Sequence, residues 1–127
     1  MRVFRVINCG GIAHKSPMTM QIYADVCGKT MEISRSSQTG ALDSAVAAAV
    51  VAGPARGGYT DFREAIRRMT GVSDVRYIPN PERSATYDRL FALYRDLHDS
   101  FGIKGAAMDL YACMKTLIEI RDRTRKI

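Results

Sequence analysis

The sequence has few of the residues that form metal centres or disulfide-rich domains. Its 127 residues include three cysteines, Cys9, Cys27 and Cys113, and two histidines that stand far apart, His14 and His98. An odd number of widely spaced cysteines, without a Cys-x-x-Cys pair, indicates neither a disulfide framework nor a zinc site. We therefore expect three free thiols, all buried, and no metal ligands.

Long apolar runs are also missing. No stretch approaches the roughly 20 apolar residues that cross a bilayer. The first five residues lack the apolar run and cleavage site of a signal peptide. Apolar residues nevertheless make up 46% of the chain, and its length fits one domain. We expect a cytoplasmic protein with a hydrophobic core and no membrane partner.

The formal charge of +6 favours an anionic partner such as a nucleotide or a nucleic acid. Much of the excess lies in the last residues, Arg121, Arg123, Arg125 and Lys126. Cations at that place complement the carboxyl end of a helix dipole. No aromatic residues interleave them, and no helix-turn-helix or RNA-binding signature is present. We therefore expect no nucleic-acid partner.

A strand, a glycine pair and a helix open the chain. Residues 3–9 are β-branched and aromatic, which predicts a buried strand, and Gly10-Gly11 predicts a turn. Ser16 is suited to cap a helix that begins with Pro17 and ends before Gly28. Apolar residues surround most of this helix, so we expect it to be largely buried.

The remaining elements are mostly helical. We expect a strand at 30–34, a very apolar helix at 41–52 deep in a core, a helix capped by Thr60 that ends at 69, an extended segment at 75–78, and helices at 81–101 and 106–125. The first two strands and the helix between them predict a parallel βαβ unit. Two strands offer too little surface for an apolar helix, so further strands are expected beside residues 3–9.

The glycine pair is the first candidate binding feature. Without Cβ atoms, Gly10 and Gly11 let a ligand approach the backbone at the carboxyl end of a parallel strand, where α/β proteins bind ligands. The next helix start and Lys15 suit an anion. The segment is neither Gly-x-Gly-x-x-Gly nor a phosphate loop, and ordinary turn chemistry is the alternative interpretation.

Four stretches together carry a family resemblance. They are residues 9–26, Ser37-Gln38-Thr39 before Ala41-Leu42, residues 77–82, and residues 93–102. In order and spacing they resemble the carboxyl-terminal domain of the FGGY carbohydrate kinases, and most of all the ribulokinase branch. The resemblance covers about residues 3–102 and, more loosely, the last helix.

The resemblance implies an α/β fold that is part of an actin-like, ribonuclease H-like ATPase domain, a βαβ unit followed by a helical carboxyl-terminal region. Residues 1–127 would form the carboxyl-terminal part of the second, nucleotide-side domain, with a βαβα portion at 1–53 and a helical tail at 59–127. The implied activity is ATP-dependent phosphorylation of L-ribulose at its 5-hydroxyl in arabinose catabolism, with Mg²⁺ on the phosphates.

Family motifs place seven residues of this sequence on the nucleotide. The backbones of Gly10 and Gly11 would approach the ribose and α-phosphate; Ala13, Lys15 and Ser16 would line the nucleotide side; Gln38 and Leu42 would border the adenine. Two departures predict weakened ATP binding. Ser16 replaces the usual asparagine, and Asp43-Ser44 replaces glycine-alanine in the second helix.

The resemblance also implies what this segment does not supply. The catalytic aspartate, the phosphate motifs and the sugar-binding domain that would contact the pentulose belong to a preceding segment. No catalytic residue is therefore assigned, and the chain alone is expected to be inactive. We expect His98 to be packed and hydrogen-bonded, His14 to contact ligand or face solvent, and the aspartates, Asp25 among them, to be caps or solvated charges.

The other hypothesis is a non-catalytic interaction module. Exposed helix stripes and an unpaired strand edge favour self-association, so a homo-oligomer is its expected form.

Overall fold

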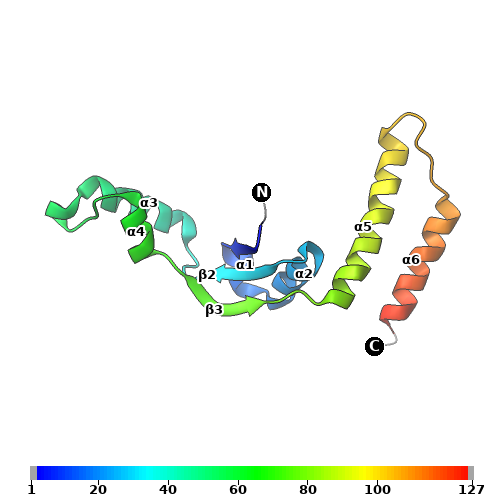
Figure 1. Ribbon diagram of the computed structural model, residues 1–127, viewed down its shortest axis with the longest axis horizontal. Coiled ribbons are helices and arrows are strands. Elements are labelled where there is room, and N and C mark those ends of the chain that lie inside the picture. Colours follow the sequence, from blue (N-terminus) through cyan, green and yellow to red (C-terminus); the bar gives the residue numbers. More distant parts are fainter. Residues whose placement is uncertain (1–2, 126–127) are drawn as a thin grey trace. The chain divides into compact units, whose positions relative to one another are not determined.

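The computed structural model describes residues 3–125, which form two compact units divided between Pro79 and Asn80. The first unit contains β1 (Arg5–Asn8), α1 (Gly11–Lys15), α2 (Pro17–Cys27), β2 (Thr30–Ser34), α3 (Thr39–Ala52), a 3-10 helix (Pro54–Arg56), α4 (Phe62–Met69) and β3 (Val72–Tyr77), labelled in Figure 1. The second unit contains α5 (Pro81–Gly102) and α6 (Leu110–Thr124). Lys126, part of the basic tail, lies outside the described residues.

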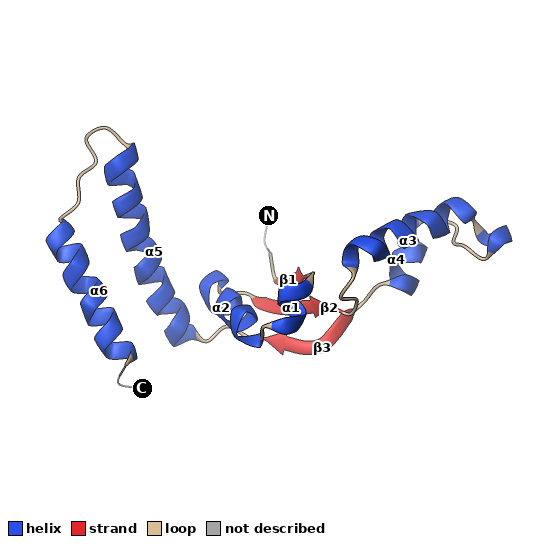
Figure 2. Cartoon of the chain, turned by 180° about the vertical axis from the view of Figure 1, so that it is seen from behind, coloured by secondary structure: helices blue, strands red, loops and turns tan. Residues whose placement is uncertain are grey.

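The first unit is built on a three-stranded sheet with the order β1-β2-β3 (Figure 2). β1 and β2 are parallel, with Ile7 opposite Glu32, so the predicted βαβ unit is confirmed. β3 runs antiparallel to β2, with a register shift between Glu32 and Ser34. The predicted extended segment at 75–78 is confirmed for residues 75–77, but it belongs to a third strand that begins three residues earlier, at Val72.

One face of the sheet carries the core. Ala13, Met20 and Ile33 are almost completely buried there, and Tyr77 packs against them. The prediction that the helix at 17–27 is largely buried was wrong: Met20 is 2% exposed, but Met18 on the opposite side of α2 is 72% exposed. α2 therefore buries one face only. β1 also differs from the predicted buried strand, because its residues alternate between exposed and half-buried.

The opposite face of the sheet centres on a buried carboxylate. Glu32 on β2 is 3% exposed and accepts ion-pair contacts from Arg5 Nη1 at 2.9 Å and Arg76 Nε at 3.1 Å. Both arginines lie on neighbouring strands and stay largely in solvent. A buried charge is tolerated only when it is paired, so these two contacts explain how an acidic residue occupies the middle strand.

The helix starts follow local capping chemistry. Ser16 Oγ accepts from Thr19 N at 3.3 Å, and Gly28 ends α2 in the left-handed conformation, so both predicted signals are confirmed. α4 differs: Asp61, and not Thr60, is the cap, and its Oδ1 accepts from Glu64 N at 2.8 Å. The carboxylate of Glu64 reaches back to Thr60 N, which completes a reciprocal cap.

α3 is as apolar as predicted but is not deep in a core. Val46 is its one buried residue, and Val51 is 87% exposed. Its carboxyl end is held by a tight loop, in which the carbonyl of Ala49 accepts from Gly53 N and Tyr59 N. The sequence correctly indicated that the sheet in this chain offers too little surface for such a helix.

The second unit is a helical hairpin. Cys113 and Ile120 of α6 are buried. The residues that the sequence places along one side of the predicted helix at 106–125 are exposed: Ala107, Tyr111, Met114, Leu117, Ile118 and Arg121. α6 also begins later than predicted, because Asp109 caps it by accepting from Ala112 N. His98 bonds to Asp99 but is not packed, since its side chain is 67% exposed.

The cysteines and the helix lengths complete the description. Cys113 is a buried free thiol, but Cys9 and Cys27 are exposed, so the prediction of three buried thiols was wrong for two of them. Among residues 3–125, no helix combines the length and apolar character that a membrane span requires.

Candidate functional site

The glycine pair lies at the carboxyl end of β1, beside open space. Gly10 has a φ of +88°, a conformation that favours glycine. A Cβ atom placed on Gly10 or Gly11 would meet no described atom within 4 Å beyond the adjacent residues. Gly11 is not part of a turn as predicted, because it is the first residue of the short helix α1. The geometry leaves this backbone open to a ligand.

The residues after the glycine pair differ in the chemical groups that they can present to a ligand. Ala13 is 3% exposed and packs in the core, so it can face a ligand only through its backbone. Lys15 is exposed and free to bring a positive charge. Ser16 Oγ is already bonded to Thr19 N and Thr19 Oγ1, at 3.3 and 2.8 Å. With Pro17 lacking an N–H, the start of α2 is largely capped from within, which weakens the predicted anion site there.

The second candidate loop runs from β2 into α3. Ser34 Oγ donates to the carbonyl of Ser36 at 3.0 Å, and Gln38 N donates to Ser36 Oγ at 3.2 Å. Gln38 precedes the first residue of α3 and is exposed, with no capping bond from its side chain. Leu42 follows one turn later and is half-buried. Ser36 therefore fixes the start of the helix that carries Gln38 and Leu42.

One contact joins the two loops. The carbonyl of Ser36 accepts from His14 Nε2 over 3.2 Å, between residues 22 positions apart in the sequence. The sequence left His14 as a ligand contact or a solvent-facing residue, and its bond to the second loop was missed. A histidine followed by a serine-rich loop gives no pairing signal, because both residue types also occur in unconnected surface loops.

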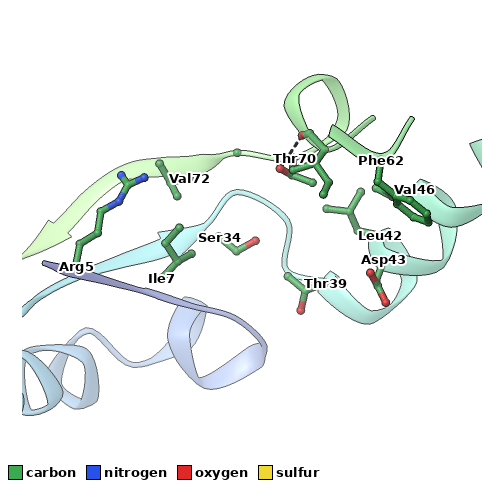
Figure 3. A pocket seen from close by; sticks show the side chains of 12 residues that line it. Arg5, Ile7, Ser34, Thr39, Leu42, Asp43, Val46, Phe62, Thr70 and Val72 are labelled. Atoms are coloured by element: carbon green, nitrogen blue, oxygen red, sulfur yellow. Dashed lines mark hydrogen bonds between the residues drawn. The ribbon is translucent and has the colours of Figure 1, made fainter. Parts of the chain in front are cut away.

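A hollow of about 470 Å³ lies on the Glu32 face of the sheet, between β1, β2 and the helices α3 and α4 (Figure 3). Of the seven candidate residues, Leu42 lines it, next to Asp43. Its other walls include Ile7, Phe62 and Ile66, which are about half exposed. Its lining does not include the other six candidate residues, which are Gly10, Gly11, Ala13, Lys15, Ser16 and Gln38. The candidate residues therefore do not gather in this cavity.

Metal ligands do not gather either. Within residues 3–125, no three side chains of His, Cys, Asp or Glu form a group that could hold an ion.

Asp25, which the sequence assigned to a cap or to solvent, is instead 2% exposed and accepts from Gln21 Nε2 at 2.8 Å.

Comparison with known sequences gives a consistent family. Residues 1–52 match the model of the FGGY family of carbohydrate kinases, C-terminal domain. The chain is 39% identical over 117 residues to a ribulokinase of Bacillus licheniformis, which covers 92% of this chain and 21% of that enzyme. It is 45% identical over 94 residues to a ribulokinase of Anoxybacillus flavithermus, and this match covers 74% of this chain and 17% of that enzyme. The chain thus spans about a fifth of the length of these relatives.

Solved structures show the same relationship. The fold resembles a xylulose kinase from Lactobacillus acidophilus with a TM-score of 0.67, over 82% of this chain and 20% of that one, at 24% identity. A gluconate kinase from the same organism matches with a TM-score of 0.58, over 71% and 17%, at 26% identity. The mixed α/β unit is therefore part of the actin-like ATPase fold of these kinases. Over residues 1–52 the chain is thus similar to the C-terminal domain of the FGGY family of carbohydrate kinases.

Proposed function

We propose that this chain forms the nucleotide-side wall of an ATP-dependent carbohydrate kinase that phosphorylates L-ribulose in arabinose catabolism. The observation that carries the proposal is the uncovered backbone of Gly10 and Gly11 at the carboxyl end of a parallel strand. Ligands of open α/β sheets bind at this edge. The similarity to ribulokinases supports the choice of reaction and sugar. A cytoplasmic location stays a prediction.

In this proposal, different residues of the wall contact different parts of the nucleotide. The glycine backbones approach the ribose and α-phosphate, and exposed Lys15 adds positive charge beside them. Gln38 and Leu42, held by Ser36 at the start of α3, border the adenine. The residues present fit a nucleotide of this kind because the backbone is open and the nearby charge is positive. ATP, when bound, would supply the phosphoryl group, and Mg²⁺ would neutralise the charge of its phosphates; no described residue is assigned to the metal ion.

By itself the chain is expected to give no turnover. Phosphoryl transfer requires a positioned sugar hydroxyl as well as a positioned phosphate. The chain spans 21% of the Bacillus licheniformis ribulokinase, and in this proposal the sugar-contacting part lies outside that span; no catalytic residue is assigned in this chain. An assay of the pure chain with ATP, Mg²⁺ and L-ribulose tests this, and robust product formation would contradict the assignment.

Removal of the Asp43 charge should strengthen nucleotide binding. Asp43 is exposed and follows Leu42, so its carboxylate lies on the proposed adenine side. Between solvated unit charges the interaction is at most about 1 kcal/mol, and it weakens with the distance from Asp43, on the adenine side, to the phosphates. We expect Asp43→Gly and Asp43→Asn each to raise ATP affinity by roughly two- to fivefold, measured by titration at low salt.

The paired variants separate charge from helix stability. Asp43→Asn removes the charge without the glycine penalty inside α3. Asp74→Asn, an exposed charge on β3, is the matched control and should leave affinity unchanged. Equal affinities for the unchanged chain and both Asp43 variants would count against a nucleotide on this side of α3.

A non-catalytic, self-associating module is the second candidate. In the second unit, Phe91 and Tyr94 of α5 are each 63% exposed, and Tyr111 of α6 is 71% exposed. Exposed aromatic residues at helical spacing are typical of helix-docking faces. Light scattering across a concentration series tests this candidate, and a monomer at every concentration would contradict it.

A further inference from the structure

We propose that His14 is a positioning residue of the nucleotide wall, because its imidazole holds the loop before α3 against the short helix that follows the glycine pair. The inference rests on the proposed function and adds to it a specific determinant of nucleotide affinity. It starts from the bond between His14 Nε2 and the carbonyl of Ser36, at 3.2 Å.

The hydrogen bond fixes the form of the imidazole. A carbonyl oxygen can only accept, so Nε2 must carry the hydrogen, either in the neutral Nε2–H tautomer or in the charged ring. The same carbonyl accepts from Ser34 Oγ at 3.0 Å. Two donors from two directions hold the Ser36 peptide, one from the end of β2 and one from α1.

Hydrogen bonds also connect Ser36 to the residues on the proposed adenine side. Its Oγ accepts from Gln38 N at 3.2 Å, and the carbonyl of Gln38 accepts from Leu42 N at 3.0 Å. A continuous path of hydrogen bonds therefore runs from His14 to Ser36, then to Gln38 and Leu42. It ends on the two residues proposed to border the adenine.

The other end of the path is anchored in the core. His14 lies in the last turn of α1, beside Ala13, which is 3% exposed and packs against Met20 and Ile33. Gly11, whose backbone is proposed to approach the α-phosphate, starts the same helix. His14 thus links the phosphate side to the adenine side. A pocket whose two sides are held at a fixed spacing before the ligand arrives binds more tightly than one that must order them.

The imidazole is exposed, so its removal should change the wall without unfolding the unit. In His14→Ala the bond is lost. In His14→Gln the side-chain amide can donate from nearly the place of Nε2. His98→Ala is the matched control, because it removes the other histidine from the second unit. The full chain, isotope-labelled for NMR, would be titrated with ATP and Mg²⁺, and amide hydrogen exchange of Gln38 would be followed without nucleotide.

We expect His14→Ala to weaken ATP binding by about two- to tenfold and to speed exchange of the Gln38 amide, as loss of one hydrogen bond implies. His14→Gln should restore both properties, and His98→Ala should match the unchanged chain. Equal affinity of the His14→Ala variant and the unchanged chain would overturn the inference, as would a His14→Gln variant as weak as His14→Ala. If the unchanged chain binds no ATP, the proposed function fails first, and the exchange rates then report only on loop structure.

Discussion

Replacement of Met20 by alanine should cost the first unit a large part of its stability, about 2–5 kcal/mol. Met20 is 2% exposed and lies at the centre of the small core with Ala13 and Ile33. Truncation removes most of the side chain and leaves a cavity that its neighbours Ala13, Ile33 and Tyr77 cannot close. A unit of this size has a total stability of only about 4–12 kcal/mol, so a variant partly unfolded at room temperature is expected.

The control lies two residues away. Met18 is on the same helix but is 72% exposed, so Met18→Ala should change stability by less than about 0.5 kcal/mol. Urea unfolding followed by circular dichroism measures both variants. If the two substitutions lowered the midpoint equally, α2 would not pack on the sheet through the face described above.

Gly58→Ala should destabilise the loop that closes the end of α3. A Cβ atom on Gly58 would overlap the carbonyl oxygen of Ala49, which is backbone and cannot rotate away. That carbonyl accepts from Gly53 N and Tyr59 N, so moving it also disturbs the end of the helix. Overpacking of this kind costs about 1–3 kcal/mol.

Gly40→Ala provides the opposite expectation. Gly40 lies in the first turn of α3, where an added Cβ would meet no described atom within 4 Å beyond its own helix and chain neighbours. Alanine in a helix is favoured over glycine by about 0.5–1 kcal/mol, so this variant should be slightly more stable. Thermal unfolding measures the stability of the Gly58→Ala and Gly40→Ala variants relative to the unchanged chain. A Gly58→Ala variant as stable as Gly40→Ala would show that the loop does not approach Ala49.

Local signals in the sequence predicted the fold where the chemistry is local. Ser16-Pro17 and Gly28 predicted both ends of α2, and Pro81 predicted the start of α5. These signals depend on a residue's own backbone and its nearest neighbours, which the sequence contains. The first half of β3 was missed for a related reason: Ser73 and Asp74 are poor strand formers, and the strand extends over them because it pairs with β2.

Burial was harder to predict than element type. The apolar composition of α3 predicted a deep position, but only Val46 is buried, because composition reports what a helix can bury and not what is present to cover it. The sequence pattern of α6 likewise did not predict which of its sides is buried. Several sides of that helix carry apolar residues, and the packing of Cys113 and Ile120 selects one.

The candidate site shows the same division. The glycine pair was predicted from sequence, and the φ of +88° at Gly10 explains why glycine stands there. That Gln38 and Leu42 contact the same ligand follows from the family motif alone and stays a prediction. The connection between the two loops, from His14 to Ser36, was not predictable because it joins residues 22 positions apart through one side chain. Ser16 looked like a nucleotide contact, and its capping role also follows from its position before Pro17.

In the proposed function, Gly10–Gly11 and the start of α3 form a nucleotide wall, and residue-by-residue NMR titration with ATP and Mg²⁺ tests this most directly. We expect saturable shifts at the amides of Gly10, Gly11, Gln38 and Leu42, with α5 and α6 unchanged. Millimolar affinity is sufficient, since the chain spans only about a fifth of its relatives. Absence of shifts at high millimolar ATP, or shifts confined to Arg121 and Arg123 in the basic end of α6, would contradict it.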